Sequence, residues 1–248
     1  MRFFATIVFT FAILFCAVCA DDDPKKARAA FDKADKALNE VWAALKGKLG
    51  PEEFKSLQED QRSWLAYRDY IATGIGTVGP EPDEAKAKRT PQYLEMAAGL
   101  MESRVEFLRT YLKEIPPDDS LSGRWDDSRG GRIEIVQRDG KLYFSISVVR
   151  GPTFHLGSLA GCAKWNDPLG FFSDNAKDGD GEKKEGEAWL FFRKEGTSLK
   201  IDGAGTHEYH GARAYFDGSY RRLSPIDNQR AAKIVESAKK GLPPDEKE

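Results

Sequence analysis

The chain has 248 residues and an almost balanced charge, with 38 basic and 40 acidic side chains and a formal net charge of −2 at pH 7. This balance excludes the overall basic excess that recruits nucleic acid, and the sequence has no polybasic helix for an anionic membrane surface. The length suits two domains of about 100 residues each. No intrachain disulfide is expected in the processed chain, because only Cys162 lies beyond residue 20.

The first 20 residues have the pattern of a cleaved export signal. Arg2 precedes the apolar run Phe3–Val18, and small residues end at Ala20. This pattern predicts an exported protein of the periplasm, the cell surface or the medium, with no membrane span in the mature chain. Two alternatives are an uncleaved N-terminal anchor and a lipid anchor at Cys19. The lipid anchor is less favoured because Val18 stands where lipidation motifs usually have a smaller residue.

Residues 21–115 are predicted to form a helical domain. Apolar residues recur every three or four positions over 24–49, and Pro24 follows three aspartates, which suit a helix start. A second helix begins at Pro51 with acidic residues in its first turn, and a third runs from Thr90 to Ile115. Residues 73–89, rich in glycine, proline and charge, are expected to form a long loop. The short first connection predicts an antiparallel three-helix bundle.

The hydrophobic pattern changes at residues 116–120, which contain two prolines and are the predicted interdomain linker. Beyond them the hydrophobic period falls from about 3.6 to 2, which indicates strands. Turns at Asp139-Gly140 and Glu195-Gly196 predict two tight hairpins. The predicted strands cover residues 132–137, 142–149, 154–159, 170–173, 188–194, 197–202 and 212–216.

Two further segments suggest how this sheet closes. Gly123-Arg124-Trp125 near its start is similar to Gly218-Ser219-Tyr220 near its end, and pairing between them would remove the open edges. The predicted fold class is α+β: the helical bundle, then a small antiparallel β-barrel or sandwich over residues 121–222. A short helix at about Ile226–Lys239 and a charged tail complete residues 223–248.

Two short motifs in the helical part carry a family resemblance. Residues 34–39 read ADKALN, and residues 61–69 read QRSWLAYRD. At this spacing they resemble the N-terminal domain of the LprI-type lysozyme inhibitors. The resemblance implies an exported, non-enzymatic protein whose partner is lysozyme or another envelope protein. Many family members have a cysteine where this chain has Ala72, so it implies a domain without their disulfide. The motif residues are Leu38, Asn39, Gln61, Trp64, Tyr67, Arg68 and Asp69.

The same residues also have a structural interpretation. Trp64 and Leu65 are expected on the core face of the second helix. Arg68 and Asp69 are expected to join helix ends by charged hydrogen bonds, with contact to a partner as the alternative. Asn39 is expected to form a hydrogen bond between helices.

No catalytic, cofactor or metal site is predicted. Residues 74–79 match the GxGxxG pattern, but a dinucleotide site needs a preceding strand and a following helix. His207 and His210 are three residues apart, whereas the metalloprotease motif places its histidines four apart. Residues 173–182 are rich in oxygen ligands but lack the glycine and glutamate positions of a calcium loop. Cys162 is expected to be a small buried hydrophobe.

The leading functional hypothesis is therefore a non-enzymatic binding protein of the LprI type. C-type lysozymes are basic, so acidic segments are the expected contacts, since opposite charge speeds association. The candidate segments are residues 21–23, 81–84 and 174–187. The alternative is a protein that binds a small ligand inside the barrel.

Overall fold

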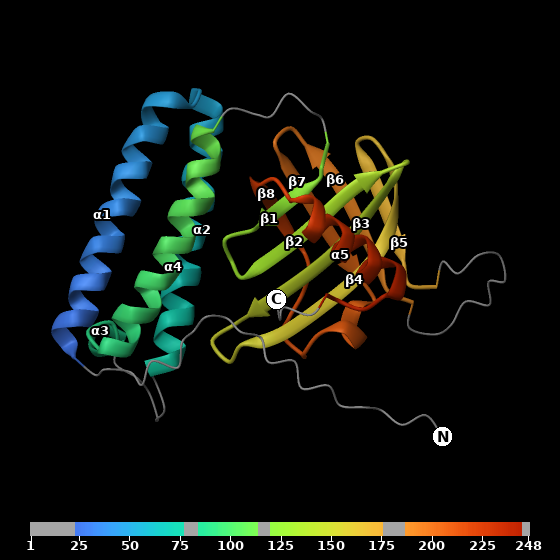
Figure 1. Ribbon diagram of the computed structural model, residues 1–248. Helices are drawn as coiled ribbons and strands as arrows, with labels where there is room; N and C mark the ends of the chain where they lie inside the picture. The colour runs from blue at the N-terminus through green and yellow to red at the C-terminus, as the bar shows by residue number, and fades with distance from the viewer. Residues whose placement is uncertain (1–22, 77–83, 114–119, 176–186, 245–248) are drawn as a thin grey trace, which may run out of the picture.

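The computed structural model describes residues 23–76, 84–113, 120–175 and 187–244 (Figure 1). A group of helices lies beside a closed β-barrel, and a last helix covers part of the barrel wall. The α+β class predicted from the sequence is therefore confirmed. The predicted export signal, including Cys19, and residues 116–119 of the predicted linker lie outside the described residues.

The helical part contains α1 (Pro24–Lys48), α2 (Pro51–Gly76), α3 (Glu84–Ala87), α4 (Pro91–Arg109) and the short 3-10 helix η1 (Thr110–Leu112). Side-chain oxygens of Asp23 and Thr90 cap α1 and α4 by accepting backbone N–H groups. The prediction of a loop over residues 73–89 is wrong at both ends, because α2 continues to Gly76 and α3 precedes Thr90. The end of α2 lies against the barrel, since a Cβ on Gly74 would be 2.2 Å from the Cβ of Pro152.

Helix α4 packs against both α1 and α2 (Figure 1). Their shared core includes Leu38, Leu45, Leu57, Trp64, Met101 and Leu108. The prediction that Leu65 joins this core is wrong, since its exposed fraction is 36%. One helical position turns a side chain by about 100°, which moves Leu65 from the buried face of Trp64 toward solvent. Among the described residues, every helix is too short or too polar to span a membrane.

The barrel is an antiparallel meander in which each strand pairs with the next and β8 closes on β1. Trp125 of β1 pairs with Arg222 of β8, so the predicted closure of the sheet is confirmed. The described strands are β1 (Gly123–Asp126), β2 (Gly131–Arg138), β3 (Lys141–Arg150), β4 (His155–Asn166), β5 (Leu169–Ser173), β6 (Trp189–Glu195), β7 (Ser198–Ala204) and β8 (Gly218–Ser224).

Two predicted strands differ in the structure. Residues 212–216 form turns and irregular backbone after the 3-10 helix η2 (Thr206–Tyr209), although Ala214 and Phe216 are buried. Apolar residues can thus fill the core without joining the sheet. The strand predicted at 154–159 begins at His155 and continues to Asn166 as the long strand β4.

Apolar side chains fill the barrel interior. Phe144 lies with its ring centroid 5.2 Å from those of both Phe172 and Phe192. Outside the barrel, α5 (Asn228–Lys240) buries Ile234 and Ala238 and packs against β2, β3 and β4. Cys162 of β4 is free and half-buried, and burial raises the pKa of its thiol. The thiol therefore stays protonated at neutral pH.

Candidate functional site

The motif residues of α2 hold the turn that joins β1 to β2. The indole Nε1 of Trp64 donates to the backbone oxygen of Ser128 at 3.0 Å. The hydroxyl of Tyr67 donates to the backbone oxygen of Arg129 at 2.8 Å. Residues three apart share one face of a helix, so the spacing of Trp64 and Tyr67 matches two consecutive carbonyls of the turn.

Arg104 of α4 also contacts the β1–β2 turn. Its side chain is wholly buried, and it donates to the hydroxyl of Ser128 at 2.7 Å and to Oε1 of Gln61 at 2.9 Å. It also forms an ion pair with Asp60, which accepts a second bond from Arg129 of the turn at 2.7 Å. We call Asp60, Gln61, Trp64, Tyr67 and Arg104 the clasp.

Charge stabilises the clasp. Burial alone would raise the pKa of Asp60, but the guanidinium groups of Arg104 and Arg129 outweigh it and hold that pKa below its ordinary value. Asp60 is therefore ionised at neutral pH and compensates the charge of the buried Arg104. A buried charge without such a partner is strongly destabilising.

Residues of the barrel fix the backbone of the β1–β2 turn by hydrogen bonds. Ser128 has a φ of 58°, and its N–H donates to Oδ1 of Asp126 at 2.6 Å. Asp127 accepts the N–H groups of Arg129 and Gly131 and forms a buried ion pair with Arg150 at 2.6 Å. These bonds fix the strained backbone, so the clasp meets carbonyls that are already in position.

Arg68 and Asp69 join helices within the helical part. Arg68 donates to Oδ1 of Asp69, which also accepts the hydroxyl of Tyr93 at 2.9 Å. Lys88 lies 2.9 Å from the other carboxylate oxygen. Burial would raise the pKa of Asp69, but bonds from Lys88, Arg68 and Tyr93 outweigh it and lower that pKa. The pair links α2 to α4 and to the segment before it.

The first motif divides between core and solvent. Leu38 is buried in the helical core. Asn39 is exposed and donates to Asp35 at 3.0 Å, one turn earlier on α1. The predicted hydrogen bond between helices is therefore wrong, because position 39 lies on the solvent side of α1. The motifs thus serve contacts inside this chain, and a surface for a partner must be sought elsewhere.

An acidic stripe on α4 is such a surface. Glu95, Glu102 and Glu106 are all exposed, with the small residue Gly99 between them. Their spacing of seven and four residues places them on one helix face. None of the three carboxylates forms an ion pair with another residue that the structure describes. The sequence interpretation considered acidic loops and missed this stripe, although its spacing was visible.

The acidic segments predicted from the sequence lie mostly outside the described residues. Three of their described acidic members are engaged within the chain. Asp23 caps α1, Asp174 accepts the hydroxyl of Tyr209 at 2.8 Å, and Glu187 accepts that of Ser173. The α4 stripe is therefore the better-defined acidic surface.

The other sequence patterns have structural explanations where they fall within the described residues, which exclude 77–83 and 176–186. Gly74 lies against the barrel, because a Cβ there would be 2.2 Å from the Cβ of Pro152. His207 is exposed beside Glu208 in η2, and the ring of His210 lies 3.0 Å from the hydroxyl of Thr206. Within the described part of the chain, no three histidine, cysteine, aspartate or glutamate side chains gather closely enough to hold a metal ion.

Comparison with known proteins finds a match in the helical part. Residues 18–106 match the model of the family described as "Lysozyme inhibitor LprI". The match spans α1, α2, α3 and most of α4, so it includes the clasp and the whole acidic stripe. No curated protein and no solved structure matches the chain. The barrel lies outside the matched region.

Proposed function

We propose that this protein, which carries an LprI lysozyme inhibitor domain at residues 18–106, is an exported, non-enzymatic protein that binds lysozyme and blocks its activity. The observation that carries the proposal is the acidic stripe on α4, which lies within the matched domain and is open to solvent. C-type lysozymes are basic proteins that cut glycan with two carboxylates in a cleft. A row of unpaired carboxylates has the complementary charge.

The stripe is long enough to form part of an interface with another protein. Glu106 lies eleven positions after Glu95, and at about 1.5 Å per residue the row extends for roughly 16 Å. A standard inhibitor interface buries about 800 Å² on each partner, which is more than three side chains provide. The exposed side of the neighbouring helix α1 can supply further area (Figure 1).

The clasp contributes by fixing the position of α4, which carries the acidic stripe. Arg104 connects α4 to Ser128 of the barrel, and Trp64 connects α2 to the same turn. A surface that is rigid before binding loses less conformational freedom on association. In this account the motif residues act on lysozyme binding by positioning α4.

The alternative, a small ligand inside the barrel, has less support. Bulky apolar side chains of β3, β5 and β6 meet at the centre of the barrel, as the contacts of Phe144 show. Interior residues such as Ile133, Ile146 and Leu199 are wholly buried against their neighbours. A ligand would have to displace this packing.

The test is turnover of bacterial cell walls by a C-type lysozyme at low salt, with purified residues 21–248 in molar excess. We expect inhibition that weakens as salt is added, because salt screens exposed charges. The variant Glu95→Gln/Glu102→Gln should inhibit less, and Glu52→Gln/Glu59→Gln on α2 is the control with equal charge loss. Unchanged turnover with the wild-type chain would overturn the proposal.

A further inference from the structure

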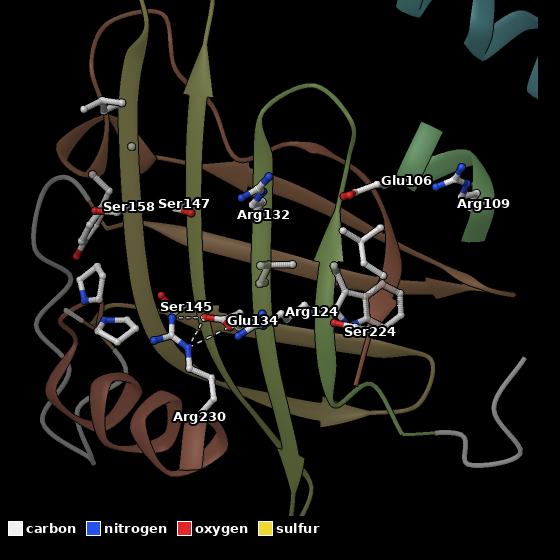
Figure 2. Close-up of a pocket in the computed structure, with 18 of the residues that line it drawn as sticks. Glu106, Arg109, Arg124, Arg132, Glu134, Ser145, Ser147, Ser158, Ser224 and Arg230 are labelled. Carbon is white, nitrogen blue, oxygen red and sulfur yellow. Dashed lines mark hydrogen bonds and ion pairs between the residues drawn. The ribbon is translucent and has the colours of Figure 1, made fainter. Parts of the chain in front are cut away.

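A basic groove crosses the outer face of the barrel between α4 and α5 (Figure 2). Its volume is about 770 Å³. The cationic residues that line it are Arg109, Lys113, Arg124, Arg132 and Arg230, and the carboxylates among the described lining residues are Glu106 and Glu134. The groove therefore carries an excess of positive charge, whereas the whole chain is slightly acidic.

Serine residues on neighbouring strands make the groove hollow. Ser145 and Ser147 of β3 and Ser158 of β4 point outward into it (Figure 2). Their small side chains leave room that larger residues would fill. Ser147 pairs with Arg132 of β2 on one side and with Ser158 on the other. The register thus places two hydroxyls and a guanidinium in one row across the sheet.

Two arginines of the groove, Arg124 and Arg132, each donate a hydrogen bond from Nε to a carboxylate. Arg124 donates its Nε to Glu134 at 3.0 Å, and Arg132 donates its Nε to Asp126 at 3.2 Å. Glu134 is itself held by Arg230 of α5, as the dashed lines of Figure 2 show. The side chains of Arg124 and Arg132 remain 53% and 72% exposed.

This arrangement leaves the outer edge of each guanidinium available. With Nε engaged, the two Nη groups of Arg124 and of Arg132 have no hydrogen bond to another described residue. Paired N–H groups of this kind match the two oxygens of a carboxylate or phosphate. The carboxylates behind them fix the arginine side chains, so part of the ordering cost is met before a ligand arrives.

We propose that this groove binds an acidic glycan, with the guanidinium groups of Arg124 and Arg132 on its carboxylates and the hydroxyls of Ser147 and Ser158 on its sugar hydroxyls. The residues that line the groove come from β1, β2, β3 and β4, so it crosses several strands, which suits a chain ligand. Of the two aromatic residues that line it, Trp125 is buried and Tyr209 is half-buried with its hydroxyl bound to Asp174, so the groove has no row of exposed rings on which the bases of single-stranded nucleic acid could stack. The proposal does not rest on lysozyme binding, although Glu106 belongs both to the acidic stripe and to the lining of the groove.

The test is calorimetric titration of purified residues 21–248 with three probes. These are oligogalacturonate, neutral maltooligosaccharide of equal length and polyphosphate, which is an anion without sugar. We expect saturable binding of oligogalacturonate and none of the neutral sugar. The variant Arg124→Gln/Arg132→Gln should weaken binding at least tenfold. The control Arg193→Gln/Lys200→Gln removes two charges from β6 and β7 and should change it less than twofold.

A second variant separates a glycan site from a general anion site. Because each serine would lose a hydrogen bond to the sugar, Ser147→Ala/Ser158→Ala should weaken binding of oligogalacturonate about tenfold and leave binding of polyphosphate unaffected. The proposal would be overturned if oligogalacturonate does not bind. It would also be overturned if Arg124→Gln/Arg132→Gln and the control Arg193→Gln/Lys200→Gln lose equal affinity for oligogalacturonate. If polyphosphate binds as tightly as oligogalacturonate, and the serine change leaves the affinity for oligogalacturonate unchanged, the glycan part of the proposal is overturned. Melting temperatures of all variants check folding.

Discussion

The indole Nε1 of Trp64 lies 3.0 Å from the backbone oxygen of Ser128, so a wholly buried tryptophan of α2 donates to a turn of the barrel. Trp64 also packs with Met101 and Leu108 in the helical core. One side chain therefore contributes both to the packing of the helices and to their attachment to the barrel. The predictions about stability follow from this double role.

Replacement of Trp64 should reveal both contributions. Trp64→Ala should lower the free energy of unfolding by about 3–5 kcal/mol, the usual cost of removing a large core side chain. Trp64→Phe keeps an aromatic ring but leaves the oxygen of Ser128 without its donor, which should cost about 1–3 kcal/mol. Chemical denaturation measures both. Leu65→Ala is the control, and a loss below about 1 kcal/mol for Trp64→Ala would contradict the burial of the indole.

Replacement of Arg104 should lower the free energy of unfolding about as much as replacement of Trp64. Arg104→Met keeps an apolar chain of similar length but removes the cation between Asp60 and Ser128. We expect a loss of about 3–5 kcal/mol, because breaking a buried ion pair leaves its partner poorly compensated. The double variant Arg104→Met/Asp60→Asn should recover part of that loss. Additive effects of the two changes would show that the two side chains do not interact.

Asp126 gives stability a distinctive pH dependence. Burial and the neighbouring Asp127 raise the pKa of Asp126 to about 6, above an ordinary value of about 3.9 in an unfolded chain. Between about pH 4 and pH 6 the folded state therefore binds more protons than the unfolded state, and this group lowers stability as the pH rises. The pKa values of Asp60 and Asp69 are lowered, so their effects fall below this window.

The measurement compares melting temperatures of the wild-type chain and Asp126→Asn between about pH 4 and pH 7. The amide oxygen of asparagine can still accept the N–H of Ser128. We expect the wild type to lose stability relative to the variant as the pH rises. A constant difference across the range would show that Asp126 titrates at its ordinary pKa.

The clasp should keep the two parts together after the chain is cut. The domain boundaries predicted from the sequence place a linker at residues 116–120, and cleavage there should leave two folded fragments. Because Trp64, Tyr67 and Arg104 all bond to the β1–β2 turn, we expect the fragments to elute together in gel filtration. Tyr67→Phe/Arg104→Met should release them. Separate elution of the wild-type fragments would contradict a stable clasp.

Local patterns made much of the fold predictable. The starts of α1, α2 and α4 follow from prolines and capping residues that lie next to them in sequence. The hairpin at Asp139-Gly140 follows from a turn whose two residues both have positive φ. The strand predicted at 212–216 was wrong because the hydrophobic pattern reports burial, and Phe216 is buried from an irregular segment.

The clasp and the groove could not be predicted in this way. Trp64 and Ser128 are 64 positions apart, and only the folded chain shows that the motif helix meets the barrel turn. The groove depends on the register of Arg132, Ser147 and Ser158, which belong to three strands. The acidic stripe differs, since the spacing of its glutamates was readable before the fold was known.

The most direct test of the central claim is calorimetric titration of a C-type lysozyme with residues 21–248 at low salt. We predict a saturable one-to-one complex whose affinity falls about tenfold in Glu95→Gln/Glu102→Gln, equivalent to about 1.4 kcal/mol, and stays unchanged in Glu52→Gln/Glu59→Gln. Absence of binding by the wild-type chain would contradict lysozyme as the partner. Equal losses in the two variants would contradict the acidic stripe of α4 as the contact surface.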